Sequence, residues 1–281
     1  MNVNFQPQMP AIKDWLINSS HLLLGVGIPS AKLDAELILS IAVKKDRTYL
    51  HAHPDQELLD EQIEIANLNL KKRLERLPIA YILGYKEFYG RNFLVSPDVL
   101  IPRPESETII EILIQAVKEL FKNNPLSLID VGTGSGCLGI SAKLEIPEIH
   151  VTLSDISTDA LEIAKKNANN LKANVEFING NLLDKLDEKI DIIIANLPYV
   201  DQSWERSPET NFEPPLALFA DRDGVALIEN LIIQTEHKLN KNGLLIIEAD
   251  PIQHNQLISF ASNYNLHLYK KDGFIISFLK N

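Results

Sequence analysis

The sequence predicts an α/β protein in which a small helical bundle precedes a doubly wound, mostly parallel β-sheet that ends in an antiparallel hairpin. The first eighty residues carry helical patterns and no strand pattern. After Pro125, apolar strands alternate with amphipathic helices, and a glycine-rich loop follows the first of these strands. The 281 residues are 45% hydrophobic and 23% charged, a globular composition that excludes a disordered or fibrous protein.

Residues 1–78 are expected to form a helical domain that docks a substrate, because so small a bundle is no obvious catalytic unit. Helices are predicted over residues 12–24, after Ser30, around Tyr49 and over residues 60–77, where Pro78 ends the last of them. The last helix carries a basic cluster that we interpret as its solvated face: Lys71, Lys72, Arg73 and Arg76.

Residues 79–104 are expected to connect this bundle to the rest of the chain. Two short strands on either side of a Gly90-Arg91-Asn92 turn predict a β-hairpin between residues 87 and 95. A helix is predicted from about residue 105 to residue 121, so the larger α/β domain should cover residues 105–281.

The α/β domain is expected to be Rossmann-like. Core strands are predicted at residues 126–131, 150–153, 175–179, 190–195 and 244–248. Buried apolar strands separated by helices imply parallel pairing. Residues 266–270 and 274–279 flank Asp272-Gly273, which predicts the antiparallel hairpin at the end of the sheet.

A cofactor site is predicted at the end of the first core strand. The strand runs into a glycine-rich loop that opens a helix, formed by Gly132, Thr133, Gly134, Ser135 and Gly136. Glycines let the backbone turn sharply and let a ligand approach it closely. Asp155 follows about 20 residues further on at the end of the next strand, where a carboxylate can accept hydrogen bonds from both ribose hydroxyls. The alternative is a tight turn without a ligand, but the two features together indicate an adenosine-containing cofactor.

The fourth core strand ends in Asn196-Leu197-Pro198-Tyr199, which indicates methylation of a planar nitrogen. An amide nitrogen is a poor nucleophile because its lone pair is delocalised into the carbonyl. The Asn196 side-chain oxygen can accept one N–H of such a group, and the Leu197 backbone carbonyl can accept the other. Tyr199 can stack on the flat amide. The alternative is a strand that simply ends in an Asn-x-Pro turn.

Composition limits the partners. The formal net charge of −11 and the sequence pI near 5.1 argue against direct nucleic-acid binding through a broad basic face. No apolar run reaches the roughly 18–20 residues that span a bilayer, and the first ten residues lack a signal-peptide pattern. We therefore expect a cytoplasmic protein, a monomer, without membrane contact. No metal is expected, since His51 and His53 have no third ligand placed by the sequence.

The chain resembles the class I S-adenosyl-L-methionine-dependent glutamine methyltransferases of peptide-chain release factors, the HemK or PrmC group. Besides the glycine loop, Asp155 and the Asn196 tetrapeptide, the resemblance rests on these blocks: Pro78-Ile79-Ala80-Tyr81-Ile82-Leu83-Gly84, Glu87-Phe88-Tyr89-Gly90, Leu100-Ile101-Pro102-Arg103-Pro104-Glu105-Ser106-Glu107 and Phe212-Glu213-Pro214. The series spans most of the chain and is far more specific than any one motif. It implies a helical N-terminal domain and a hairpin before the methyltransferase domain.

The resemblance also implies roles for individual residues. The loop from Gly132 to Gly136 would bind the methionine part of the cofactor, and Asp155 would bind the ribose. Asn181 and Leu182 match positions that flank the adenine, although the family commonly has an acidic residue in place of Asn181. Asn196 would contact both cofactor and substrate.

The residues from Arg103 to Glu107 would lie over the active site, and Arg103 and Glu105 would bind the substrate. The alternative for Glu105 and Glu107 is a helix-start role. Leu197 stands where the family usually has proline. Because the required acceptor is a backbone carbonyl, leucine can supply it, and Pro198 still favours an extended backbone at residue 197.

The function implied is methylation of the glutamine in the Gly-Gly-Gln motif of class I release factors. A close alternative is a glutamine methyltransferase of a ribosomal protein. A second is an adenine-N6 methyltransferase on RNA or DNA, since Asn-Leu-Pro-Tyr also resembles the motif of ribosomal-RNA adenine dimethyltransferases. A third, a non-catalytic cofactor-binding module, fits poorly with the retained Asn196, Pro198 and Tyr199.

Overall fold

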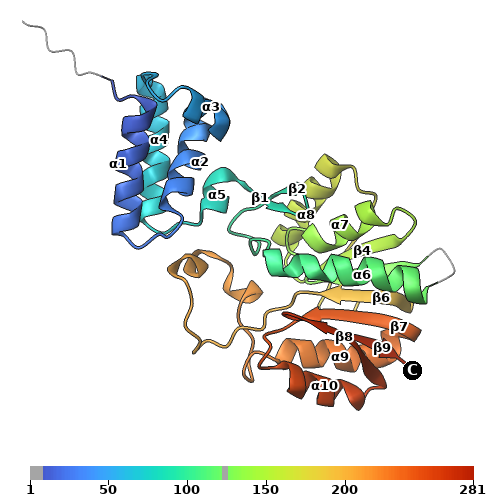
Figure 1. Cartoon of the computed structure of the whole chain (residues 1–281). Coiled ribbons are helices and arrows are strands. Elements are labelled where there is room, and N and C mark those ends of the chain that lie inside the picture. The colour runs from blue at the N-terminus through green and yellow to red at the C-terminus, as the bar shows by residue number, and fades with distance from the viewer. Residues whose placement is uncertain (1–8, 122–125) are drawn as a thin grey trace, which may run out of the picture. The chain divides into compact units, whose positions relative to one another are not determined.

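A computed structural model of the chain describes residues 9–121 and 126–281 (Figure 1). Within these ranges the chain divides into two compact units. The first contains the residues up to Gly84 together with Pro208–Phe212, and the second contains Tyr85–Ser207 and Glu213–Asn281. None of the described helices is both long and apolar enough to cross a membrane.

The first unit is helical, as predicted. Its helices are α1 (Ile12–Gly25), α2 (Ala31–Val43), α3 (Arg47–Ala52), α4 (Asp60–Leu74) and α5 (Ile79–Leu83). The bounds of α1, α2 and α3 agree with the sequence patterns. Helix α4 ends before the predicted residue 77, because Arg76 has a left-handed backbone with φ of 72°, which interrupts the helix two residues before Pro78. The short helix α5 was not predicted.

The basic cluster of α4 is not simply a solvated face, so that interpretation is wrong for Arg73. The Arg73 side chain is 5% exposed, and its Nε lies 2.7 Å from Asp34 Oδ2. Its Nη2 lies 3.0 Å from Glu209 Oε1, and Arg76 reaches the other oxygen of Glu209 at 2.8 Å. A buried charge requires a partner. The Asp34 pair joins α4 to α2, and the two Glu209 pairs join the short 3-10 segment Pro208–Phe212 to α4 and to Arg76 just beyond it.

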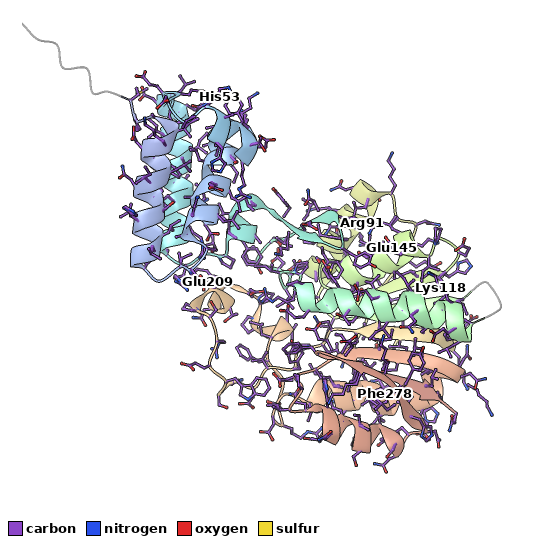
Figure 2. All side chains as sticks on the ribbon, in the orientation of Figure 1. His53, Arg91, Lys118, Glu145, Glu209 and Phe278 are labelled. Carbon is purple, nitrogen blue, oxygen red and sulfur yellow. The ribbon has the colours of Figure 1, made fainter. Side chains whose placement is uncertain are left out.

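The second unit begins with a two-stranded antiparallel hairpin, β1 (Tyr85–Phe88) and β2 (Arg91–Leu94). The predicted turn at residues 90–92 is wrong, because the turn residues are Tyr89 and Gly90. Both have positive φ, 49° and 71°, as a two-residue hairpin turn of type I′ requires. Arg91, the first residue of β2, forms a 2.6 Å ion pair with Glu145 (Figure 2).

The main sheet has seven strands in the order β5-β4-β3-β6-β7-β9-β8. The strands are β3 (Ser127–Val131), β4 (His150–Asp155), β5 (Glu176–Asn179), β6 (Ile190–Ala195), β7 (Leu239–Glu248), β8 (Leu266–Asp272) and β9 (Ile275–Lys280). Strands β3 to β7 pair in parallel, and β9 pairs antiparallel with both β7 and β8. The predicted mostly parallel sheet with a C-terminal hairpin is confirmed, and β7 begins at Leu239 rather than Leu244.

Helices cover both faces of this sheet, as in other doubly wound folds. They are α6 (Glu107–Leu120), α7 (Cys137–Glu145), α8 (Thr158–Leu171), α9 (Ala226–Lys238) and α10 (His254–Ser262) (Figure 1). One core contains Leu128 of β3 with residues of α6, α7 and α8, and the other contains Ile129 with residues of α9 and α10. Consecutive strand residues thus serve opposite faces. The parallel strands β3, β4 and β6 end at one edge, where the site lies.

Candidate active site

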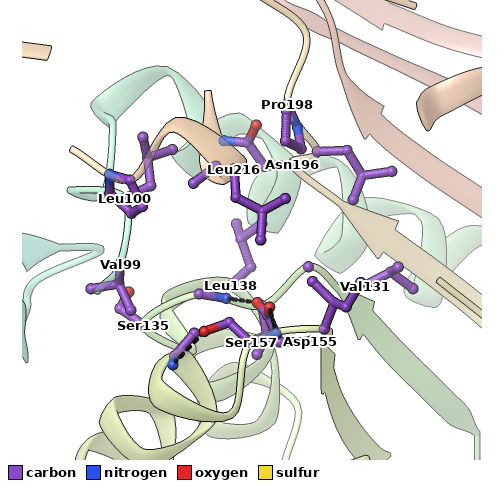
Figure 3. Close-up of a pocket in the computed structure, with 18 of the residues that line it drawn as sticks. Val99, Leu100, Val131, Ser135, Leu138, Asp155, Ser157, Asn196, Pro198 and Leu216 are labelled. Carbon is purple, nitrogen blue, oxygen red and sulfur yellow. Dashed lines mark hydrogen bonds between the residues drawn. The ribbon is translucent and has the colours of Figure 1, made fainter. Parts of the chain in front are cut away.

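A pocket lies at the carboxyl ends of β3, β4, β5 and β6, entirely within the second unit (Figure 3). One side is formed by the glycine loop and by the residues that follow β4 and β5. The other side is formed by Asn196, Leu197 and Pro198 after β6, with Ser106 near the start of α6. Val99, Leu100 and Leu216 add apolar surface. Ligands of open α/β sheets bind at this edge, so the pocket has the predicted location.

The glycine loop turns from β3 into α7 through three residues with left-handed backbones. The φ values are 71° at Gly132, 55° at Gly134 and 82° at Gly136. The amides of Gly132 and Thr133 donate to the Ser154 carbonyl of β4 at 2.8 and 3.0 Å. The residues from Gly132 to Ser135 line the pocket, whereas Gly136 is the N-cap of α7 and packs toward Ile140.

Asp155 ends β4 and supports the loop from the side of the pocket. Its Oδ2 accepts from the Gly134 amide and its Oδ1 from the Ser157 amide, both at 2.9 Å. Burial raises the pKa of Asp155, and these two backbone N–H groups oppose the rise. Each carboxylate oxygen keeps a second lone pair for a ligand hydroxyl.

A second carboxylate, Asp130, lies beneath the loop and was not selected from the sequence as a site residue. Its Oδ2 accepts from Thr133 Oγ1 at 2.6 Å and from the Gly139 amide at 2.9 Å. Its Oδ1 is buried and accepts no hydrogen bond in the described part of the chain. Burial raises the pKa of Asp130 to about 6.

Asn181 and Leu182 line the pocket beyond the end of β5, at the positions expected to flank an adenine. The Asn181 amide donates to Asp184 Oδ1 at 2.9 Å. Leu182 has a left-handed backbone with φ of 54°, a conformation that a leucine rarely adopts.

The four residues after β6 lie in different surroundings. Asn196 lines the pocket, and its Nδ2 donates to Ser106 Oγ at 3.0 Å. Leu197 is 5% exposed, with its side chain packed against Gly132. The Tyr199 hydroxyl donates to Glu248 Oε1 at 2.9 Å, and burial together with that carboxylate raises the pKa of Tyr199.

Comparison with known proteins identifies the family. The PrmC N-terminal domain model matches residues 14–84, and the methyltransferase small domain model matches residues 108–210. A release factor glutamine methyltransferase of Koribacter versatilis is 38% identical over 234 residues, which cover 80% of this chain and 82% of that protein. The chain belongs to the release factor glutamine methyltransferase family.

Other members of the family differ in length. A release factor glutamine methyltransferase of Neisseria gonorrhoeae is 37% identical over 77% of this chain and 80% of its own length. A bifunctional methyltransferase of Rickettsia bellii is 34% identical over 276 residues, which cover 88% of this chain and 50% of that protein. The chain thus spans about half the length of the bifunctional relatives that it matches.

Solved structures confirm the fold of the sheet. A methyltransferase from Pyrococcus furiosus has a TM-score of 0.53 at 17% identity and covers 70% of this chain and 92% of its own. The 16S rRNA N2 G1207 methyltransferase of Thermus thermophilus also has a TM-score of 0.53, at 13% identity, over 70% of this chain and 50% of its own.

The pocket fits S-adenosyl-L-methionine, the methyl donor that membership of this methyltransferase family indicates. An ideal Cβ built on Gly134 meets no atom within 4 Å, so the missing side chain leaves open space beside the loop. The Asp155 carboxylate can accept from ligand hydroxyls, and Val131, Leu182 and Leu227 form an apolar part of the pocket wall. The cofactor predicted from the sequence agrees with this donor set.

Three residues of this site were given no role of their own from the sequence. Ser106 and Glu248 form the hydrogen bonds behind Asn196, and Glu213 supports the opposite rim. The Glu213 carboxylate accepts from the Ile101 amide at 3.0 Å and from Arg103 Nη2 at 2.6 Å. Ser106 and Glu213 stood in the quoted blocks, whereas Glu248 is the last residue of a predicted apolar strand and gave no signal of its own.

Arg103 and Glu105, which were predicted to bind the substrate from over the site, lie in different surroundings. Arg103 lines the pocket while paired with Glu213. Glu105 is exposed and is not among the residues of the pocket wall, whereas its neighbour Ser106 is. Glu107 begins α6, and its Oε1 accepts from the Tyr89 amide at 2.8 Å.

Proposed function

We propose that this chain is an S-adenosyl-L-methionine-dependent protein-glutamine N5-methyltransferase. Its substrate would be the glutamine of the Gly-Gly-Gln motif in class I peptide-chain release factors. One observation carries the proposal: Asn196 Nδ2 donates to Ser106 Oγ. The Asn196 side-chain oxygen is therefore available to a substrate in the pocket beside the glycine loop. The curated family members named for this reaction support the substrate.

The proposed chemistry depends on holding a weak nucleophile. S-adenosyl-L-methionine, when bound, supplies an electrophilic methyl group on a sulfonium. Asn196 Oδ1 and the Leu197 carbonyl would accept the two N–H groups of the substrate amide and fix the direction of its nitrogen. Such positioning can contribute several kcal/mol to the rate. The Tyr199 ring would lie against the flat amide, with its hydroxyl anchored on Glu248.

The backbone at Leu197 suits this role although the family usually has proline there. Pro198 favours an extended conformation at residue 197, which aims the carbonyl. The Leu197 side chain is buried against Gly132, so packing supplies rigidity that a proline ring would otherwise supply. We infer that the substitution leaves the acceptor in place.

The remaining assignments follow the same arrangement. The loop from Gly132 to Gly136 would bind the methionine part of the cofactor and Asp155 the ribose. Asn181 and Leu182 would flank the adenine, and Asn196 would also face the cofactor. Arg103, with the exposed Glu105 beside it, is proposed to contact the release factor.

No observation favours the alternative reading as an adenine-N6 methyltransferase. The relatives at 37–39% identity are named for release factor glutamine, and the net charge is −11. A ribosomal-protein glutamine is the competing substrate to include in the assay. Because release factors act on cytoplasmic ribosomes, we propose a cytoplasmic enzyme that works as a monomer without direct contact to nucleic acid or membrane.

A methyl-transfer assay tests the proposal. The chain is incubated with S-adenosyl-L-methionine carrying a labelled methyl group and a class I release factor with Gln or Ala in its Gly-Gly-Gln motif. We expect label on the Gln protein only. Label on the Ala protein would contradict the assigned position, and label on ribosomal protein or RNA alone would replace the proposed substrate.

A further inference from the structure

A chain of hydrogen bonds connects the buried Glu248 to Asn196. Ser106 Oγ donates to Glu248 Oε2 at 2.5 Å, and Asn196 Nδ2 donates to Ser106 Oγ at 3.0 Å. The Tyr199 hydroxyl occupies the other oxygen, Glu248 Oε1, at 2.9 Å. Glu248 ends β7 and is 1% exposed, so water does not replace these partners.

The chemistry of these groups fixes the direction of every bond in the chain. An ionised carboxylate has no proton and can only accept, so both hydroxyls must donate to Glu248. Ser106 has one proton and gives it to Glu248, so Ser106 Oγ can only accept from Asn196. Asn196 must therefore turn its NH2 group toward Ser106. Within residues 9–121 and 126–281, nothing donates to Asn196 Oδ1, which stays available to a ligand.

We propose that Ser106 and Glu248 are positioning residues that orient the Asn196 amide and thereby make the site select a carboxamide over a carboxylate. The inference rests on the proposed function. Oriented in this way, Asn196 Oδ1 and the Leu197 carbonyl are both acceptors. A glutamine side chain can donate an N–H to each of them, whereas a glutamate carboxylate has no proton to donate.

The selectivity follows from what a mismatched substrate would leave unpaired. A site built to accept hydrogen bonds strongly rejects a group that lacks the donors, because its buried acceptors lose water without gaining a partner. If Asn196 were free to rotate by half a turn, its Nδ2 would instead donate to a carboxylate. Releasing Asn196 should therefore weaken the reaction with glutamine and improve the binding of glutamate.

The decisive variant is Ser106→Ala, compared with Ser106→Thr, which keeps the hydroxyl. Two versions of a release factor are used, with Gln or with Glu in the Gly-Gly-Gln motif. We expect Ser106→Ala to lower kcat on the Gln protein by about 10- to 100-fold, below the loss for removing a group that touches the reacting atoms. The KM for S-adenosyl-L-methionine should stay unchanged, and Ser106→Thr should restore most of kcat.

The second readout is selectivity, which a merely structural role would not move. The Glu protein is tested as a competitor of methyl transfer, and its inhibition constant is divided by the KM of the Gln protein. In Ser106→Ala this ratio should fall by about tenfold, the change expected when one hydrogen-bonded discrimination is lost. In Ser106→Thr the ratio should equal that of the wild type.

A matched control is Ser141→Ala. Ser141 is a buried serine of α7 whose hydroxyl has no partner in the described ranges. We expect it to leave kcat and the selectivity ratio unchanged. An unchanged kcat in Ser106→Ala, or a loss of kcat with an unchanged ratio, would overturn the inference. If the wild type itself fails to label the Gln protein, the proposed function fails instead, so the two failures are distinguishable.

A third readout uses Glu248→Gln, which keeps an acceptor for Ser106 and turns a donor toward the Tyr199 hydroxyl. Burial raises the pKa of Glu248; the Ser106 and Tyr199 hydroxyls and the Arg103 charge oppose the rise, while Glu105 adds to it. A protonated Glu248 carries one donor and one acceptor, as a glutamine does, and no longer dictates that Ser106 donates to it. As the pH falls, kcat of the wild type should therefore decline toward the lower kcat of Glu248→Gln, and the variant should show no acid limb of its own. An acid limb that persists in the variant would contradict the role of Glu248.

Discussion

The two sides of the pocket are held in place by different kinds of interaction. On the cofactor side, backbone amides of Gly134 and Ser157 bind Asp155, and these partners lie close together on consecutive strand ends. On the substrate side, Asn196 is oriented by Ser106 and Glu248, with sequence separations of 90 and 142 residues along the chain of bonds. The cofactor side therefore depends on a local backbone pattern, and the substrate side depends on single side chains brought together by the fold.

The largest effect should come from the substrate side. Asn196→Ala removes one of two acceptors from the reacting amide, and kcat should fall by about 10²–10³-fold, the scale for one aligned polar group at a reacting centre. Affinity for the cofactor should change far less. The measurement is methyl transfer to a release factor, with the cofactor Kd taken from calorimetry. As a control, Asn240→Ala removes a 2.8 Å bond to Asp191 near the opposite end of β6 and should leave kcat unchanged. Full activity in Asn196→Ala would remove Asn196 from the mechanism.

The same difference explains what could be predicted from the sequence. The strands, the glycine loop and Asp155 were predicted because hydrophobic periodicity and a contiguous motif specify them locally. Glu248 could not be found, because its role exists only when β7 lies beside β6 and α6 lies above both. The turn between β1 and β2 was misplaced because its first residue is Tyr89, and tyrosine rarely adopts positive φ. The burial of Arg73 likewise depends on Glu209, which is distant in sequence.

The two sides also differ in how they hold a buried carboxylate. Both oxygens of Glu248 are bonded, whereas Asp130 Oδ1 has no partner among the described residues. Burial raises the pKa of Asp130 from 3.8 to about 6. Between these values the folded chain holds a proton that the unfolded chain has lost, so the free energy of unfolding decreases as pH rises through this window.

Asp130→Asn should remove that decrease. From pH 4 to pH 7, the free energy of unfolding of the variant minus that of the wild type should rise by up to about 3 kcal/mol. Urea unfolding at both pH values, without cofactor, measures the difference. Asp201→Asn is the control. Hydrogen bonds from Ser203 lower the pKa of the exposed Asp201, so this group titrates mostly below the window and its difference between pH 4 and pH 7 should stay near zero. An equal response in both variants would show that Asp130 is not the group concerned.

A smaller effect is expected for Asp155→Ala, which should weaken cofactor binding by about 1–3 kcal/mol, the cost of leaving ligand hydroxyls poorly paired. Calorimetry with S-adenosyl-L-methionine measures it. Asn179→Ala is the control, because Asn179 Nδ2 supports the same turn by donating to the backbone carbonyls of Asp155 and Ile156 at 3.0 Å. If both variants lose the same affinity, Asp155 acts by ordering the loop rather than by contacting the ribose.

The smallest effect concerns the contact between Gly132 on the cofactor side and Leu197 on the substrate side. A Cβ built on Gly132 would lie 2.8 Å from Leu197 Cδ2, and Gly132 has φ of 71°. Gly132→Ala should therefore destabilise the chain by about 1–2 kcal/mol from backbone strain, plus the displacement of the leucine side chain. Leu197→Pro alone should be tolerated, because proline keeps the carbonyl and favours the same extended backbone.

Combining these changes isolates the steric part of the cost. In the Leu197→Pro background no leucine methyl opposes the new Cβ, so Gly132→Ala should cost about 0.5–1 kcal/mol less than in the wild type. Gly134→Ala is the matched control: its φ of 55° imposes similar strain, but a Cβ there meets nothing within 4 Å. Its cost should be the same in both backgrounds. Urea unfolding of the four single and double variants measures both couplings. Equal couplings for the two glycines would mean that Leu197 influences the loop through its backbone, and that packing against Gly132 does not replace the rigidity of proline.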